Sequence, residues 1–138
     1  MLTAIPLTVV PLIIFNLIAH TAGAAHWADK AFDLPLISGY CAVSYGDLLV
    51  LVGLVMLFFE TLRSAAPART AMIANHIVST VLLIVYVVQF LADPQAGDSL
   101  YLILTAIALF DVIAGFTISI RTAQRDITYA GDPAITHH

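Results

Sequence analysis

Five polar side chains lie inside long apolar stretches of the chain, and their types could support the movement of protons or small cations. They are Asn16, His20, Asp47, His76 and Asp111. Ionisable groups are costly to place in hydrocarbon, so such residues are candidates for function by default. Asp111 is the most informative of them because it lies near the middle of its apolar stretch.

The positions of these residues predict a series of stations across a bilayer. At about 1.5 Å per helical residue, Asn16, His20 and Asp47 form an outer cluster. Asp111 then lies near the centre and His76 near the inner end. Titratable groups arranged in this way are what a proton or cation path requires. The alternative is structural, since each polar group could hydrogen-bond a neighbouring helix.

Enzymatic, metal and cofactor chemistry find less support in the sequence. Catalysis by a carboxylate and a histidine needs the two groups within hydrogen-bonding reach, and the candidates are spread over about half the membrane. A haem held by two histidines needs them at one depth, but His20 and His76 lie near opposite faces, so only a symmetric dimer or a partner could complete it. We therefore predict no enzyme, no metal and no cofactor.

The composition predicts a chain that needs a lipid environment. Of 138 residues, 61% are hydrophobic and 10% are charged, against roughly 45–50% and about 25% in soluble domains. A water-soluble fold of this size could not cover so much apolar surface. No basic cluster is present, which argues against nucleic acid as a partner. The lone Cys41 excludes a redox pair within the chain.

Four apolar segments have about the 20 residues that a membrane-spanning helix needs, at positions 2–23, 39–62, 71–91 and 100–120. These segments predict an all-α integral membrane protein with four transmembrane helices in an antiparallel bundle. The bundle would form one domain, 1–122, followed by a short polar tail, 123–138. No Lys or Arg precedes the first segment, so we interpret it as a span rather than a signal peptide.

The basic residues predict the orientation of the bundle. One side carries Arg63, Arg69, Arg121 and Arg125, whereas the other carries only Lys30. The positive-inside rule then places both termini in the cytoplasm, in a multi-pass protein of a cell membrane and by style a bacterial inner membrane. Glu60 and Arg63, three residues apart, are explained by a surface ion pair at the cytoplasmic end.

The loop between the first two segments contains Trp27, which suits the boundary between water and lipid. We expect either a short interfacial helix or an ordinary connecting loop there. Two stripes of small residues predict close packing of helices, with the lining of a narrow cavity as the alternative. They are Gly39, Gly46 and Gly53 in the second segment, and Ala108, Asp111, Gly115 and Ser119 in the fourth.

Three functional hypotheses follow. The first is a non-enzymatic structural or accessory protein that associates with itself, as a homo-oligomer, or with other membrane subunits. The second is an oligomeric transporter or channel for protons or small cations that uses the intramembrane carboxylates. The third, with least support, is a redox subunit that binds haem or quinone. Small multidrug exporters have a similar size and number of spans, but their first helix carries an essential glutamate and this first segment has no carboxylate.

Overall fold

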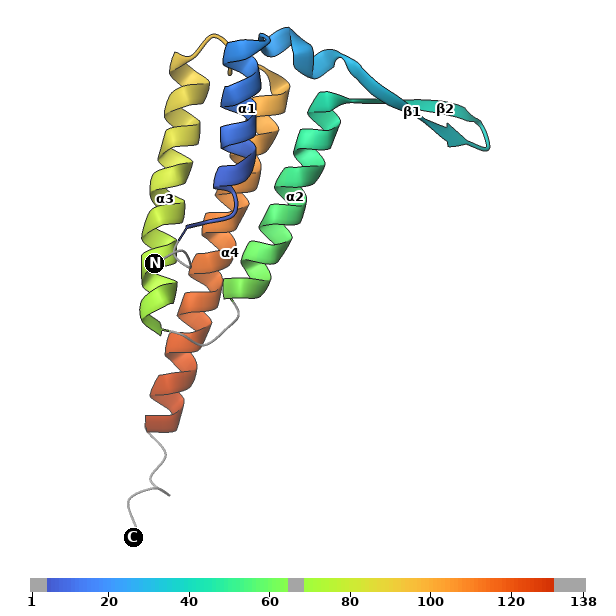
Figure 1. The fold of residues 1–138 in the computed structure, drawn as a ribbon. Coiled ribbons are helices and arrows are strands. Elements are labelled where there is room, and N and C mark those ends of the chain that lie inside the picture. Colours follow the sequence, from blue (N-terminus) through green and yellow to red (C-terminus); the bar gives the residue numbers. More distant parts are fainter. Residues whose placement is uncertain (1–4, 65–68, 131–138) are drawn as a thin grey trace.

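The structure, a computed structural model, describes residues 5–64 and 69–130 and is mostly helical. Its long helices are α2 (Tyr45–Ser64), α3 (Arg69–Ala92) and α4 (Ser99–Ala130), and consecutive helices run antiparallel (Figure 1). All three are long and apolar enough to cross a membrane, over Tyr45–Ser64, Ile73–Ala92 and Ser99–Arg125. The expected helical bundle is therefore present among the described residues.

The first helix is much shorter than predicted. α1 (Val9–Thr21) has 13 residues, which cover about 20 Å and not the about 30 Å of a hydrocarbon core. Ile5–Thr8 precede α1 without forming a helix, because a proline at position 6 disfavours helical backbone at the residue before it. Pro11 is tolerated since it lies in the first turn. Only three helices of the described chain therefore reach spanning length, not four.

The second predicted span also begins later than expected. Residues 39–44, which we predicted to be helical, form strand β2 (Gly39–Ser44), which pairs antiparallel with β1 (Lys30–Leu36). A two-residue turn closes this hairpin, and Gly39 after the turn has a φ of 141°, which favours glycine and prevents a helix from continuing through it. The hairpin projects sideways from one end of the bundle (Figure 1).

A short 3₁₀ helix, η2 (Ala24–Ala28), connects α1 to the hairpin, where we expected either a short interfacial helix or an ordinary connecting loop. Its Trp27 is only 5% exposed and packs inside the protein. The indole stacks on Phe15 with ring centroids 5.6 Å apart, and Phe15 meets Tyr101 edge-on at 4.7 Å. These aromatic contacts fix η2 against α1 and α4.

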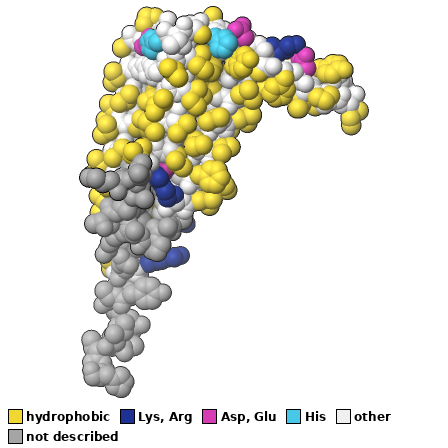
Figure 2. All heavy atoms as spheres, viewed as in Figure 1, with side chains coloured by type: hydrophobic (Ala, Val, Ile, Leu, Met, Phe, Trp, Pro, Cys, Tyr) yellow, Lys and Arg dark blue, Asp and Glu magenta, His cyan; other side chains and the backbone are white. Residues whose placement is uncertain are grey.

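At the opposite end, α4 continues to Ala130 and so includes the first part of the predicted tail. The rest of the tail, 131–138, lies outside the described residues, as do 1–4 and 65–68. Alanine, glutamine and arginine in this stretch are good helix formers, which explains the extension. Figure 2 shows apolar side chains over the length of the bundle, with charged side chains and histidines gathered toward the two ends. The core lies where α1 packs between the long helices, around Phe15, Tyr86, Tyr101 and Leu104.

Candidate functional site: two polar clusters around the short helix

An inner polar cluster surrounds the non-helical segment Ile5–Thr8. At its centre the carboxylate of Glu60, which is 0% exposed, accepts hydrogen bonds from Arg63 Nη2 at 2.9 and 2.8 Å. Asn75 Nδ2 donates to the same carboxylate at 2.7 Å. The buried charge of Glu60 is thus paired with an arginine and supported by an amide, as a carboxylate in an apolar interior requires.

The cluster also binds backbone groups that have no helical partner. Glu60 Oε2 accepts from the backbone N–H of Leu7 at 2.9 Å, and Arg63 Nη2 donates to the carbonyl of Ile5 at 2.8 Å. The Tyr86 hydroxyl donates to the carbonyl of Thr8 at 2.9 Å. Backbone groups away from water need such partners. The polar side chains of α2 and α3 therefore hold an irregular segment that could not be stable in an apolar bundle alone.

Asp111 of α4 completes the inner cluster at the start of α1. Its side chain is 6% exposed, and Oδ2 accepts a hydrogen bond from the Thr8 hydroxyl at 3.1 Å. Ser79 of α3 lies beside the same carboxyl group. A carboxylate beside a helix N-terminus is favoured by the partial positive charge there. Asp111 thus joins α4 to the start of α1 and to α3, and both contacts hold these helices together.

The predicted ion pair of Glu60 and Arg63 is present at 2.8 Å, but its predicted location at the surface is wrong, because the Glu60 carboxylate is fully buried. A signal for this was present in the sequence. Gly46 and Gly53 are seven residues apart, and Glu60 follows at the same interval, so all three lie on one face of α2. This is the buried face of the helix. The small-residue stripe should therefore have been extended to Glu60.

An outer polar cluster joins the other half of α1 to α3 and α4. The amides of Asn16 and Gln89 hydrogen-bond each other in both directions, one of them at 3.1 Å. The Tyr101 hydroxyl donates to Gln89 Oε1 at 2.8 Å, and Gln89 Nε2 donates to Asp93 Oδ2 at 3.1 Å. His20 Nε2 lies 3.4 Å from the same Asp93 oxygen. Sequence reasoning found Asn16 and His20 but missed Gln89, Tyr101 and Asp93.

Asp93, just after the end of α3, has a carboxylate with several donors. The backbone N–H of Gln95 lowers the pKa of Asp93 most, followed by the side chain of Gln89, and His20 lowers it further. Hydrogen bonds to the charged form of a carboxyl group favour that form. The rim of the outer cluster therefore holds an ionised aspartate at neutral pH.

The imidazole of His76, the predicted inner station, hydrogen-bonds outside both clusters. Its Nε2 is 2.7 Å from the hydroxyl of Ser119, and its ring stacks on Phe116 at 5.3 Å between centroids. The ring occupies the notch left by Gly115, where a Cβ atom would come within 2.0 Å of His76 Cε1. His76, Gly115 and Ser119 thus form a tight contact between α3 and α4.

The glycines of α2 lie at close helix contacts, but Gly39 does not. A Cβ atom on Gly53 would meet the Ile107 side chain at 3.1 Å, and one on Gly46 would meet the carbonyl oxygen of Trp27 at 3.1 Å. Gly39 lies in the hairpin, and nothing is within 4 Å of the position of a Cβ atom there. The stripe of small residues therefore begins at Gly46, where α2 has formed.

Asp47, the remaining candidate, is exposed and lies in the first turn of α2, at the end of the candidate span Tyr45–Ser64. Its Oδ2 accepts from the backbone N–H of Ser44 at 2.9 Å, while the Ser44 hydroxyl accepts from the N–H of Asp47 at 3.1 Å. This reciprocal pair is a capping box, which stabilises the first turn of a helix. Asp47 is thus separated from both polar clusters.

No family model, curated protein or solved structure matches this chain. Within the described residues no group of three or more His, Cys, Asp or Glu side chains is placed to hold a metal ion. His20 lies beside Asp93, which follows His76 by 17 positions, or about 25 Å of helix, so the two histidines of one chain do not face each other.

Proposed function

We propose that this chain is a small non-enzymatic membrane protein that acts as a structural or accessory subunit, and that the hairpin is the part that contacts its partner. The partner is either a second copy of the chain or another membrane polypeptide. The observation that carries this proposal is the uncovered apolar face of the hairpin. The three long apolar helices support the insertion of the bundle in a lipid bilayer.

The register of the hairpin places its apolar side chains together. Phe32 pairs with Val43 and Leu34 with Cys41, and directly paired residues lie on the same face of a sheet. Leu36 continues this face toward the turn. Phe32, Leu34 and Leu36 are each about half exposed in the described chain. The hairpin therefore presents one continuous apolar face to its surroundings.

Such a hairpin is not expected to be stable without a cover. A two-stranded sheet alone is marginally stable in water, and its open strand edges and apolar face are typical of sites where another chain binds. Tyr40 on the opposite face is 80% exposed. A partner that packs on the hairpin would supply the contacts that the bundle does not provide.

The polar clusters support a structural role for the bundle. Each carboxylate and amide in them bonds a side chain or backbone group of another element, and together they hold α1 and the segment before it. Hydrogen bonds between membrane helices commonly serve this purpose. We place the arginine-rich end, with both termini, in the cytoplasm and the hairpin on the opposite side, in a bacterial inner membrane.

The exposed thiol of Cys41 allows a direct test, because it is the single cysteine and lies on the apolar face of the hairpin. A maleimide that carries a photo-reactive group would be attached to Cys41 in native membranes, and the products identified by mass spectrometry after illumination. We expect one defined product, either a dimer of the chain or an adduct with one other membrane protein.

The matched control is Cys41→Ser with Ala123→Cys, which moves the thiol to an exposed position on α4 at the opposite end. This variant should not give the same product. If both positions yield the same scatter of products, or lipid adducts alone, the hairpin is not a docking arm and the accessory role loses its main support.

A proton or cation transporter is the second candidate, and one observation favours it. α1 begins partway along the bundle, with the Asp111 carboxylate bonded to Thr8 at its first turn. Discontinuous helices whose ends face a substrate or ion site are typical of transporters. In proteoliposomes, Asp111→Asn should abolish proton flux under this hypothesis, whereas Asp47→Asn, outside both clusters, should leave it unchanged. Wild-type protein that gives no flux above empty liposomes contradicts this candidate.

A further inference from the structure

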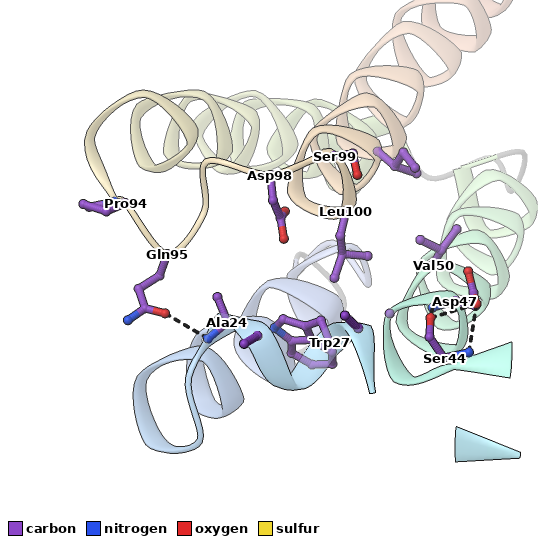
Figure 3. Close-up of a pocket in the computed structure, with 14 residues that line it drawn as sticks. Ala24, Trp27, Ser44, Asp47, Val50, Pro94, Gln95, Asp98, Ser99 and Leu100 are labelled. Carbon is purple, nitrogen blue, oxygen red and sulfur yellow. Dashed lines mark hydrogen bonds between the residues drawn. The ribbon is translucent and has the colours of Figure 1, made fainter. Parts of the chain in front are cut away.

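A pocket of about 450 Å³ opens at the hairpin end of the bundle, between η2, the first turn of α2 and the connection from α3 to α4 (Figure 3). This volume lies in the range of roughly 300–1,000 Å³ that is usual for small-molecule sites. Trp27 and Leu100 contribute apolar surface, and the two carboxylates come from Asp47 and Asp98. No side chain of either polar cluster lines the pocket, but the pocket adjoins the outer cluster, because Gln95 and Asp98 bond to Asp93 and Tyr101.

Trp27 supplies the observation that points to a ligand. The residue is 5% exposed, yet its indole Nε1–H has no hydrogen-bond partner among the described residues. A buried indole N–H usually finds an acceptor, because leaving the donor unpaired is unfavourable. Trp27 lines the pocket, so a molecule in the pocket is placed to supply that acceptor.

The carboxylates supply the complementary charge. Asp98 Oδ1 accepts from the backbone N–H of Tyr101 at 2.8 Å and so caps α4, while Figure 3 shows its carboxylate directed toward Trp27. Asp47 uses Oδ2 for the backbone and hydroxyl of Ser44. The second oxygen of each carboxylate is thus left for another donor. The residues that line the pocket include no Lys, Arg or His to neutralise these two charges.

We propose that this pocket binds a ligand of the ethanolamine type, with a primary ammonium group at Asp98 and an oxygen that accepts the hydrogen bond of Trp27 Nε1. An ammonium group donates hydrogen bonds to carboxylates, and such charge-assisted bonds are strong. A bare metal ion fits less well, because no set of three or more metal-ligating side chains is found in the described residues and an ion would leave the indole donor unpaired.

The same chemistry occurs in free ethanolamine and in the headgroup of phosphatidylethanolamine. Because Trp27 is the single tryptophan of the chain, its fluorescence reports on the pocket without a label. Ethanolamine would be titrated into the full-length protein in an uncharged detergent. The protein would also be compared in nanodiscs of phosphatidylglycerol with and without phosphatidylethanolamine.

We expect a saturable change in Trp27 emission with ethanolamine, with phosphatidylethanolamine, or with both. A response to free ethanolamine identifies a soluble ligand, and a response confined to nanodiscs identifies a lipid headgroup. Both outcomes support the proposed chemistry. No saturable response in either medium would overturn it, because the pocket would then hold solvent alone.

Conservative variants separate binding from folding. Asp98→Asn removes the charge but keeps a residue that caps helices well, and should weaken binding about tenfold. Trp27→Phe keeps the aromatic ring but removes the N–H, and should weaken binding about fivefold by calorimetry. Asp33→Asn removes one charge outside the pocket, where Asp33 pairs with Lys30, and should change affinity less than about twofold.

Equal affinity of the wild type and Asp98→Asn would also overturn the proposal. Helical content by circular dichroism checks that each variant is folded. The outcome is independent of the accessory role, because cross-linking through Cys41 tests the hairpin and not the pocket.

Discussion

The inner and outer polar clusters hold the same short helix with different chemistry. The inner cluster is ionic, with Glu60 and Arg63 bonded to the backbone of the segment before α1. The outer cluster is an exchange of hydrogen bonds between the neutral amides of Asn16 and Gln89, with one aspartate at its rim. The first satisfies irregular backbone, whereas the second joins side chains of regular helices.

This difference indicates which cluster the fold depends on more. If the inner cluster loses a member, a buried charge and several backbone groups lose their partners together, and each such loss is unfavourable. If the outer cluster loses an amide, the helices keep their own backbone bonds. The inner cluster should therefore control whether α1 is docked, and the outer cluster should tune how tightly it packs.

The largest effect should come from Arg63→Ala. This substitution leaves the carboxylate of Glu60 buried without its positive partner and removes the donor to the carbonyl of Ile5. We expect a loss of about 3 kcal/mol in the free energy of unfolding, as for other buried pairs that lose one partner. Reversible unfolding in mixed detergent micelles, followed by circular dichroism, measures it.

Arg121→Ala removes the same side chain from an exposed position on α4 and should change stability by less than about 0.5 kcal/mol. Similar losses in the two variants would mean that Glu60 is solvated in the membrane-bound protein. The contrast between the two clusters would then fail.

The long helices could be predicted from the sequence because apolar length is a strong signal that needs no tertiary information. The ends of the elements could not. The apolar residues of β2 merge with those of α2 in any hydropathy window, and the turn before Gly39 is the local mark of their separation. In the first segment, Pro6 and Pro11 are the local signs that the helix starts late, and α1 begins at Val9.

The composition of the polar clusters was harder to predict. Thr8 and Asp111 are 103 positions apart, and Leu7 and Glu60 are 53 apart, so the packing of helices decides which groups meet. Glu60 resembled a surface residue because Arg63 follows one turn later, a spacing typical of solvent-exposed pairs. Gln89 was not predicted to belong to the outer cluster, because no sequence pattern distinguishes an amide that bonds another helix from one that faces water near the end of an apolar helix.

An intermediate effect is expected from Asn16→Leu, which removes an amide at the centre of the outer cluster. Hydrogen bonds between membrane helices contribute roughly 0.6–2 kcal/mol, and we expect a loss of about 1 kcal/mol. Gln89→Leu should act similarly, and the double variant should lose less than the sum because the two amides bond each other. Additive losses from the same unfolding assay would show that this pair does not form.

The smallest effect concerns the rim of the outer cluster and depends on pH. The pKa of Asp93 in the folded protein is lowered from 3.8, chiefly by the N–H of Gln95. The unfolded chain therefore binds a proton first as the pH falls. The stabilisation by Asp93 is present in full above the pKa that Asp93 has in the unfolded chain. It is lost as the pH falls from there through the lowered pKa of the folded protein.

Asp93→Asn should show a smaller drop in thermal midpoint than the wild type between about pH 6 and about pH 3. Asp29→Asn, beside the exposed His26, makes the same change of charge and should retain the wild-type drop. If Asp93→Asn retains it as well, the rim contributes no pH-dependent stability, and the outer cluster consists in effect of its amide pair.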